Sequence, residues 1–363
     1  MVGNDYLYAS MKKNLYLMAA AAVLLACQNP SAPLPRAESA GMKQAFESYL
    51  QAVTDSSVTM HSIMVLQHGK VLAEKQFAPD TAHVMHSVSK TFTSTAVGFA
   101  ISEGLMNLDD KIVDIFPESV PENPSDTLCR ITVRNLLTMN SGHGTDPTNS
   151  IRSNDGDWIR GFMEWPIEYE PGTCYCYNSL GTYLLSAAVQ KVTGQKVVDY
   201  LEPRLWKPLG IQKPKWLESP AGINTGGWGL YLRTEDMARM GQCLLDGGKF
   251  CGKQVIPADW VAQMSSYQVP CVGAGMNEMQ VKAIQADPSN PAAKYFDPEK
   301  SDWLQGYGYQ MWRCRHNAFR ADGAVGQYII VIPDKDAVLV TTAFEPNMQK
   351  EINLIWDFIL PAL

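Results

Sequence analysis

The stretch HSVSKTFTSTAVGFAISEGLMNLDD, residues 86–110, decides the fold of this 363-residue chain. From Ser87 to about Glu103 its apolar residues recur at helical spacing, and the run ends at Gly104. This pattern predicts one buried helix. Ser87 and Lys90 stand three residues apart at its beginning, so a hydroxyl and an amine share one helix face about one turn apart.

A serine and a lysine in this arrangement suit nucleophilic catalysis. An amine in an apolar, desolvated pocket loses its proton more readily and can then accept the serine proton. The helix N-terminus would also aim unpaired backbone N–H groups at an oxyanion formed beside Ser87. The spacing alone is weak, because Ser10 and Lys13 repeat it near the N-terminus. The Gly-x-Ser-x-Gly elbow of a different hydrolase fold is absent from the sequence.

Strand patterns lie at both ends of the chain and helical patterns in the middle. A helix over 42–53 precedes two extended runs, Ser62–Leu66 and Val71–Phe77, which read as a hairpin. Residues 105–220 are helical and loop-rich. The remaining predicted segments are a helix at 234–246, a polar loop at 267–304, strands at Tyr307–Arg313, Gln327–Ile332 and Ala337–Ala343, and a helix at 347–360. This order indicates an α/β plus all-α fold class, with a sheet assembled from both termini and a helical insertion.

Composition excludes several classes of function. The 30 basic and 37 acidic residues give a formal charge of −7, with no Lys/Arg-rich run, so no nucleic-acid partner is expected. Nine Trp, 15 Tyr and 11 Phe supply more burial than a disordered chain carries. No second ligand pair accompanies Cys174-x-Cys176, and no His-Glu-x-x-His occurs, so no metal site is expected.

The N-terminus has the pattern of an export signal. Lys12 and Lys13 precede an apolar stretch that is shorter than the roughly 20 residues a bilayer span needs. We therefore expect residues 1–26 to be a lipoprotein-type signal peptide, because the stretch closes with Leu-Leu-Ala-Cys27, which resembles a bacterial lipobox with Cys27 lipidated. The alternative is an ordinary signal peptide that happens to end near a cysteine.

Residues 27–40 carry three prolines and little apolar periodicity, which suits a tether between a lipid anchor and the folded body. The sequence therefore predicts a lipoprotein of the bacterial cell envelope that faces the periplasm or the cell exterior. Its only contact with the membrane would be the lipid anchor.

Seven further cysteines leave an odd count, so at least one thiol stays unpaired within a monomer. They are Cys129, Cys174, Cys176, Cys243, Cys251, Cys271 and Cys314. A Gly-Gly turn between Cys243 and Cys251 could bring these two together as a disulfide. Burial as free thiols is the equally open alternative.

Five segments, in this order, resemble the serine β-lactamase and penicillin-binding superfamily. They are HSVSKTFTSTAVGFAISEGLMNLDDKIVDIFPE at 86–118, ITVRNLLTMNSG at 131–142, PGTCYCYNSLGTYLLSAAVQKVTG at 171–194, GGWGLYLRTEDMARMGQ at 226–242, and GYGYQMW at 306–312 followed by DGAVGQYIIVIPDKDAVLV at 322–340. The chain is most similar to the branch of class C β-lactamases, D-alanyl-D-alanine carboxypeptidases, family VIII esterases and 6-aminohexanoate-dimer hydrolases. The resemblance implies one hydrolase domain over 41–363, with an antiparallel sheet of the β-lactamase/transpeptidase type and a helical subdomain at roughly 105–220.

The resemblance assigns catalytic roles to three residues. Ser87 would be the nucleophile, Lys90 its base, and Tyr177 the tyrosine that relays protons in the family's Tyr-x-Asn motif. Ser179 departs from that motif, where Asn is usual, and is expected to contact substrate. Period-two alternation would place Tyr175 beside Tyr177 on one face, with the neighbouring cysteines on the other.

The family's third motif, Lys-Thr-Gly or His-Thr-Gly, falls on Ala321-Asp322-Gly323, which has no cation. Asp322 and Gly323 are expected to line the substrate site, and the Ala324 N–H to complete an oxyanion hole with that of Ser87. Asp322 would repel anionic substrates. Arg320 would restore a positive charge if its side chain turned inward, and both outcomes remain open.

Together these features predict a serine hydrolase that acts on a small ester, amide or peptide through an acyl-enzyme, without metal or cofactor. A class C-type β-lactamase or DD-peptidase is the first alternative, and the missing Lys-Thr-Gly argues against it. A non-catalytic peptide or peptidoglycan sensor is the second, and the intact Ser87, Lys90 and Tyr177 argue against that.

Overall fold

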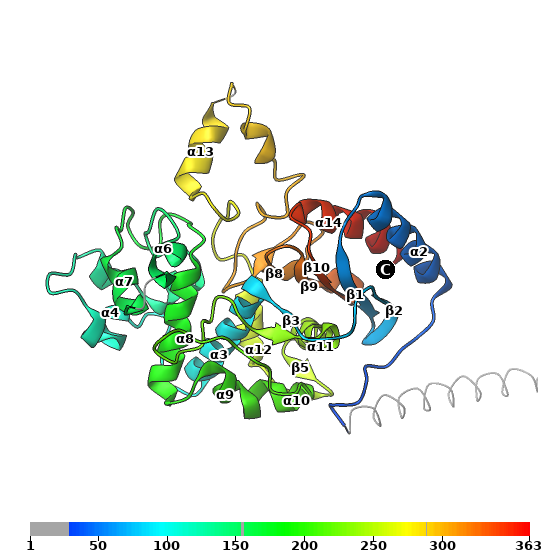
Figure 1. The fold of residues 1–363 in the computed structure, drawn as a ribbon, viewed down its shortest axis with the longest axis horizontal. Helices are drawn as coiled ribbons and strands as arrows, with labels where there is room; N and C mark the ends of the chain where they lie inside the picture. The colour runs from blue at the N-terminus through cyan, green and yellow to red at the C-terminus, as the bar shows by residue number, and fades with distance from the viewer. Residues whose placement is uncertain (1–28, 154–155, 288) are drawn as a thin grey trace, which may run out of the picture.

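The computed structural model describes residues 29–153, 156–287 and 289–363. Its centre is a six-stranded antiparallel sheet of order β2-β1-β10-β9-β8-β7 (Figure 1). The strands are β1 Met60–Gln67, β2 Lys70–Gln76, β7 Trp312–Arg313, β8 Phe319–Gly323, β9 Gln327–Ile332 and β10 Ala337–Ala343. Because β1 pairs with β10, both ends of the chain build the sheet, as the sequence predicts.

Helices from both termini cover one face of the sheet. Helix α2 (Ala40–Asp55) lies beside α14 (Met348–Leu354), which continues as a π-helical turn over Ile355–Ile359 (Figure 1). Their apolar side chains pack against Leu339 of β10. Its neighbours Val338 and Val340 face the opposite side, as the period-two geometry of a strand requires.

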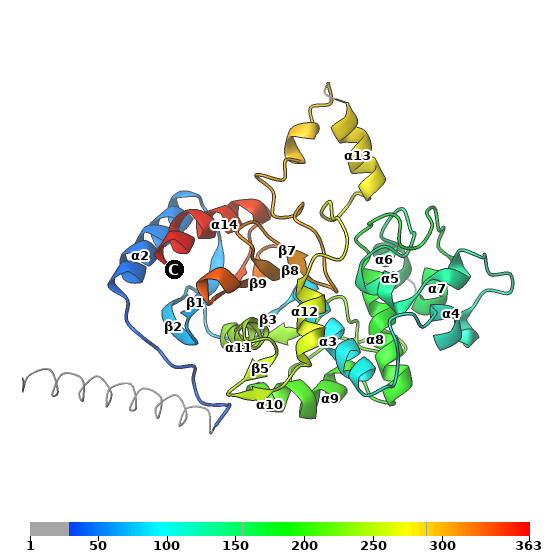
Figure 2. The same cartoon turned by 180° about the vertical axis from the view of Figure 1, so that it is seen from behind.

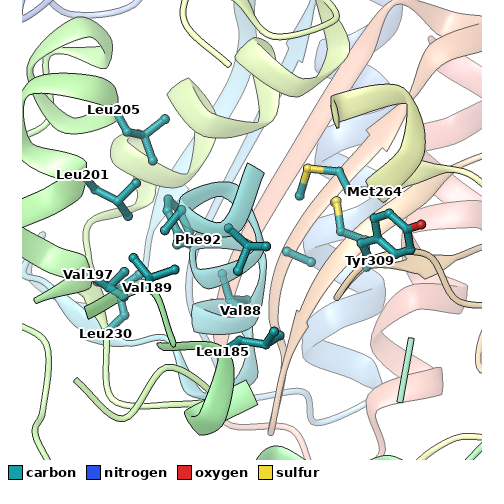
Figure 3. Close-up of a cluster of buried hydrophobic side chains, with 14 of the residues drawn as sticks. Val88, Phe92, Leu185, Val189, Val197, Leu201, Leu205, Leu230, Met264 and Tyr309 are labelled. Carbon is teal, nitrogen blue, oxygen red and sulfur yellow. The ribbon is translucent and has the colours of Figure 1, made fainter. Parts of the chain in front are cut away.

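The other face of the sheet packs on α11 (Thr234–Leu245) and on the central helix α3 (Ser89–Ser102). Helix α3 is buried almost all round, which explains its high content of small and apolar residues. Figure 3 shows Val88 and Phe92 surrounded by apolar side chains, among them Leu185 and Leu201 of the helical region and Leu230, which precedes β4. Helix α3, which follows directly after Ser87, therefore lies between the sheet and the helical region (Figure 2).

The middle of the chain is helical, as expected for 105–220. It contains α4 Ile112–Ile115, α5 Val133–Leu137, α6 Thr148–Arg152, α7 Trp158–Glu164, α8 Ser179–Thr193, α9 Val197–Leu201 and α10 Lys207–Leu209. Two-residue strands form two small sheets outside this region, β3 His83–Val84 with β4 Tyr231–Leu232 and β5 Lys249–Phe250 with β6 Lys253–Gln254. Helices α12 Ala258–Ser265 and α13 Glu278–Ala286 complete the fold.

Three details of the sequence prediction are wrong. The expected strand Tyr307–Arg313 reduces to Trp312–Arg313, and the expected loop 267–304 contains α13. Strand β8 is also missing from the sequence prediction. Its residues, FRADG, include two charged side chains, although all five residues of the strand are buried. The structure accommodates these charges by pairing Arg320 with Asp322.

The expected tether is bound to the domain over the part that the structure describes. The guanidinium of Arg239 donates to the backbone oxygens of Pro30 and Ala32, the latter at 2.6 Å. The Leu34 N–H donates to Glu235 Oε1 at 2.8 Å, and the Leu34 side chain is buried in the core. The segment 29–37 is thus a strap across the surface, and we use this name for it below.

The second half of the strap extends the edge strand β2. The Val71 N–H donates to Pro35 O at 2.8 Å, and the Ala37 N–H donates to Val71 O at 2.9 Å. Arg36 forms an ion pair with Glu74 at 2.8 Å. These backbone bonds satisfy part of an otherwise exposed strand edge.

The cysteines favour the alternative of burial. Cys243 is a reduced thiol buried in the core, so it forms no disulfide with Cys251. The predicted signal peptide 1–26 and the proposed lipidation site Cys27 lie outside the described residues. Within the described ranges, no helix has both the length and the apolar composition needed to cross a membrane.

Candidate active site

Ser87 lies in a 3₁₀ turn, His86–Val88, that leads directly into α3. The turn begins where β3 ends, and the Met85 N–H donates to Leu230 O at 2.8 Å. His86 has a φ of +46°, in the left-handed region that non-glycine residues rarely adopt. A strained residue next to the predicted nucleophile is typical of a functional turn, because the surrounding structure must hold the strain.

The Lys90 amine touches Ser87, as the helical spacing predicts. Its Nζ atom lies 3.0 Å from Ser87 Oγ and 3.0 Å from Ser179 Oγ, and donates to Gly227 O at 2.8 Å. The side chain is buried, with 1% of its surface exposed. Its three bonded partners are two hydroxyls and one carbonyl, so no carboxylate is bonded to the amine.

Burial lowers the pKa of Lys90 to about 7, although the more distant carboxylates of Asp146 and Asp322 oppose this shift. A group with this pKa is largely neutral just above neutral pH. Lys90 can therefore accept a proton from the hydroxyl that it touches.

Tyr177 completes the group of polar side chains. Its ring centroid lies 4.9 Å from Lys90 Nζ, and the neighbouring Ser87 hydroxyl partly opposes the effect of burial on the pKa of Tyr177. Burial raises the pKa of Tyr177, so the side chain keeps its proton at neutral pH. The ring stacks on Trp312 at 5.4 Å, which fixes its orientation. Tyr175 contacts the same Trp312 ring, which agrees with the predicted alternation.

Ser179 starts helix α8, directly after the N-cap residue Asn178. The Asn178 side chain accepts a hydrogen bond from the Gly181 N–H at 3.1 Å. Because the helix begins here, Tyr177 and Ser179 are presented on either side of the cap. The Ser179 hydroxyl occupies a position beside Lys90, so it belongs to the same cluster as the predicted catalytic residues.

The end of β8 lies against the serine turn. A Cβ at Gly323 would overlap the backbone oxygen of Met85, so only glycine allows this approach. Ala324 follows in the exposed turn between β8 and β9. In the described part of the chain, neither the Ser87 nor the Ala324 N–H donates to a protein acceptor. Both amides are available for an oxyanion.

Arg320 does not reach into the site as a free cation. Its Nε donates to Asp322 Oδ2 at 2.8 Å, and its Nη1 donates to Asp302 O at 2.8 Å. The side chain has no exposed surface and lies over the rings of Trp303 and Trp312. Burial raises the pKa of the Asp322 carboxyl, against the opposite effect of the guanidinium. The sequence left open whether Arg320 would supply a positive charge to the site. In the structure its guanidinium is paired with the Asp322 carboxylate.

Three groups in the site have no role that the sequence predicts. The Gly227 carbonyl accepts from Lys90, and Trp312 stacks on Tyr177. The Asp146 carboxylate accepts from the Ser179 N–H at 3.2 Å and is exposed to solvent. The only sequence signal for Asp146 is its place four residues after the matched segment that ends at Gly142.

The described residues contain no cluster of three or more His, Cys, Asp or Glu side chains that could hold a metal ion. The arrangement that remains is a part-exposed serine, a buried amine, a phenol and two unbonded amides.

Comparisons with known proteins agree with this geometry. A sequence model of the Beta-lactamase family matches residues 46–356. The 6-aminohexanoate-dimer hydrolase of Paenarthrobacter ureafaciens is 29% identical over 219 residues, which are 55% of this chain and 55% of that protein. This chain thus matches about half the length of that relative. A Beta-lactamase of Pseudomonas fluorescens is 22% identical over 327 residues, covering 80% of this chain and 90% of that one.

Solved structures share the fold. A penicillin-binding protein homologue from Pyrococcus abyssi superposes with a TM-score of 0.64 at 18% identity, covering 88% of this chain and 77% of that chain. At this identity the likeness bears on the fold alone. It supports the β-lactamase/transpeptidase-like architecture that the resemblance implies.

Proposed function

The chain belongs to the Beta-lactamase family, and from that premise we propose that it is a serine hydrolase that cleaves esters or amides through an acyl-enzyme on Ser87. The observation that carries the proposal is the buried Lys90 amine, 3.0 Å from Ser87 Oγ with its pKa lowered to about 7. A charged lysine could not accept the serine proton, whereas a neutral one in contact with the hydroxyl can.

In the first step, neutral Lys90 takes the proton of Ser87 as Oγ attacks the carbonyl carbon of the substrate. The oxygen of that carbonyl becomes negative and is stabilised by the Ser87 and Ala324 N–H groups. Tyr177, which is protonated at the start of the step, passes its proton to the leaving alcohol or amine as it takes the proton that Lys90 received from Ser87. The products of this step are the acyl-enzyme and the free leaving group.

In the second step, water enters beside Tyr177 and attacks the ester carbonyl of the acyl-enzyme. The Tyr177–Lys90 pair removes a proton from the water, and Ser87 Oγ leaves and is reprotonated. The acid product dissociates and the enzyme returns to its starting state.

We propose neutral esters or amides as the preferred substrates. Where relatives carry Lys-Thr-Gly or His-Thr-Gly, this chain has Ala321, and Arg320 is already bonded to Asp322. A substrate carboxylate would therefore find no unpaired cation at this edge of the site. A neutral acyl group loses nothing by that absence.

A β-lactamase or DD-peptidase activity is the second candidate. It is supported by the relative named Beta-lactamase, which aligns with 80% of this chain. A sensor that binds peptide or peptidoglycan without turnover is the third, and it requires no reactive Ser87.

Whole-protein mass spectrometry separates these candidates. The protein is incubated with a fluorophosphonate and, separately, with benzylpenicillin, each alongside a Ser87→Ala variant. A hydrolase of neutral substrates gains one fluorophosphonate adduct that is absent from Ser87→Ala, with turnover of short p-nitrophenyl esters. Rapid turnover of benzylpenicillin would establish the second candidate instead. If neither reagent gave an adduct or turnover, the non-catalytic sensor would be the remaining candidate.

We also propose that the protein is a lipoprotein of the bacterial cell envelope, anchored through Cys27. The support is the leader sequence, with two lysines, a short apolar stretch and a terminal Leu-Leu-Ala-Cys. Expressed with its leader in a bacterial host, the protein should partition with membranes and carry diacylglycerol, whereas Cys27→Ala should not. Equal recovery of both proteins in the membrane fraction would overturn the proposal.

A further inference from the structure

The turn between β8 and β9, residues 324–326, carries the Ala324 amide that we propose for the oxyanion hole, and its backbone is strained. Val325 has a φ of +60° and Gly326 a φ of +95°. A β-branched residue in the left-handed region is a genuine outlier, since its Cβ crowds the backbone. A strained turn holds its shape only where the surroundings over-determine it.

The Gln327 side chain contacts two of the three carbonyls of this turn. Its side-chain Nε2 donates to the Ala343 carbonyl at 2.8 Å and also lies within 3.3 Å of Ala324 O and 3.4 Å of Val325 O. The side chain is buried, with 2% of its surface exposed. One amide group thus ties the turn to the end of β10, the strand on the far side of β9.

Two further groups bond the same backbone. The Glu345 N–H donates to Val325 O at 3.0 Å, and Thr341 Oγ1 donates to Gly326 O at 3.1 Å. All three carbonyls of residues 324–326 are therefore hydrogen-bonded. The Gly326 N–H in turn donates to Gly323 O at 3.3 Å, which holds the peptide unit that carries the Ala324 N–H.

The turn is also closely packed against other parts of the protein on two sides. A Cβ at Gly326 would overlap the buried carboxyl of Glu351, and one at Gly323 would overlap Met85 O beside the nucleophile. A movement of the turn toward Glu351 or toward Ser87 would therefore produce a steric clash with the Glu351 carboxyl or with Met85 O. Its remaining freedom is rotation of the peptide units, and bonds to the carbonyl oxygens restrict that rotation.

We infer that Gln327 is a positioning residue for the oxyanion hole: by bonding the two carbonyls that follow the Ala324 N–H in the chain, it holds the shape of the β8–β9 turn in which that N–H points at the reacting carbonyl. This inference rests on the proposed function, because the amide matters only if an oxyanion forms at Ser87. A donor is required at Gln327 because all three of its acceptors are backbone carbonyls. A side chain of equal length without N–H groups could not replace it.

The test is Gln327→Met, which keeps the length of the side chain and removes both donors. The rate constant kcat for a p-nitrophenyl ester should fall by about 10²-fold, the effect of losing one oxyanion donor, while KM changes less than threefold. Affinity for a boronic acid that forms a tetrahedral anion on the serine should fall in parallel with kcat. Thr341→Val, which removes one carbonyl bond, should lower kcat in the same direction by a smaller factor.

Gln242→Met is the matched control, because Gln242 is a buried glutamine of α11 whose amide donates to Asp246, away from the turn. Its kcat should equal that of the unchanged protein. Active-site titration with a fluorophosphonate gives kcat per competent serine, so partial unfolding of a variant does not imitate the effect.

Two failures are distinguishable. If the unchanged protein hydrolyses the ester through Ser87 and Gln327→Met keeps its kcat and its boronic acid affinity, the inference is wrong and the proposed function stands. If the unchanged protein forms no Ser87 adduct and hydrolyses no ester, the proposed function is wrong and the inference falls with it.

Discussion

Lys90 and Arg320 are two buried cations in one neighbourhood of the molecule, and they have opposite properties. Lys90 has 1% of its surface exposed and Arg320 has none. Lys90 is bonded to two hydroxyls and a carbonyl, whereas Arg320 is bonded to the carboxylate of Asp322. Trp312 contacts both neighbourhoods, because its ring stacks on that of Tyr177 and the Arg320 guanidinium lies 5.5 Å from its centroid.

Their pKa values diverge for that reason. Burial lowers the pKa of Lys90 to about 7, since the carboxylates near it are not bonded to it. Burial also opposes the charge of Arg320, but the attraction of neighbouring groups including Asp322 and Asp302 outweighs it and raises the pKa. The comparison teaches that burial alone does not create a base. A buried cation becomes reactive where its bonded partners are neutral, and structural where one of them is a carboxylate.

After loss of the nucleophile itself, the largest effect is expected when Lys90 is made to resemble Arg320. Lys90→Arg keeps a positive charge but cannot lose it, so kcat for a p-nitrophenyl ester should fall by at least ~10²-fold, as for Lys90→Ala. Ser87→Ala should abolish turnover. Steady-state assays of the purified variants measure kcat, and thermal unfolding of each variant controls for folding. An arginine variant that keeps a tenth of the activity would show that the residue acts through its charge.

Removal of the Arg320 guanidinium should affect stability. Arg320→Met leaves Asp322 buried without its partner, which typically costs ~3–5 kcal/mol of the free energy of unfolding. The double variant Arg320→Met with Asp322→Leu should recover much of that loss, because no lone charge remains. Urea denaturation of the two variants and the unchanged protein gives the comparison. Equal stability of the single and double variants would mean that the pair is not what holds β8 in place.

The pairing of Arg320 also predicts discrimination against anionic substrates. A charge-assisted hydrogen bond to a substrate carboxylate is worth ~1.5–3 kcal/mol, or roughly ten- to a hundredfold in kcat/KM, and no unpaired cation at the end of β8 supplies it. Neutral short-acyl esters should therefore exceed benzylpenicillin and nitrocefin in kcat/KM. Steady-state assays with both substrate types decide this. Penicillin turnover equal to ester turnover would indicate that Arg320 leaves Asp322 when substrate binds.

The smallest effect concerns the distant carboxylates around Lys90. Because the base acts when neutral, kcat/KM should rise with pH through about 7. Asp146 opposes the lowering of this pKa, so Asp146→Asn should move the midpoint of the rise to lower pH, by roughly 0.2–0.7 unit for a solvent-exposed charge. A pH–rate profile of both proteins measures the shift. A midpoint that moved upward would contradict the assigned sign.

Much of the architecture can be predicted from sequence because it depends on local patterns. The predicted helix from Ser87 to about Glu103 agrees with the observed turn and α3, and the predicted strands at Gln327–Ile332 and Ala337–Ala343 are observed. Strand β8 could not be predicted, since its buried charges look like a loop until their pairing is known. Nor could composition show that the proline-bearing strap is held by Arg239.

The sequence by itself determined that Ser87 and Lys90 share a helix face, because helical geometry places residues three apart within reach of each other. Through an ordered set of family motifs, it also pointed to Tyr177 as the expected proton-relaying tyrosine. Only the tertiary structure decided what surrounds Lys90. Ser179 stands 89 residues away in the chain and Gly227 137 residues away, and both bond to the amine. The structure likewise decided that Arg320 pairs with Asp322 and is not a free cation. Such contacts depend on how whole elements pack, so no local spacing encodes them, and they decide whether a buried cation is a base or a support.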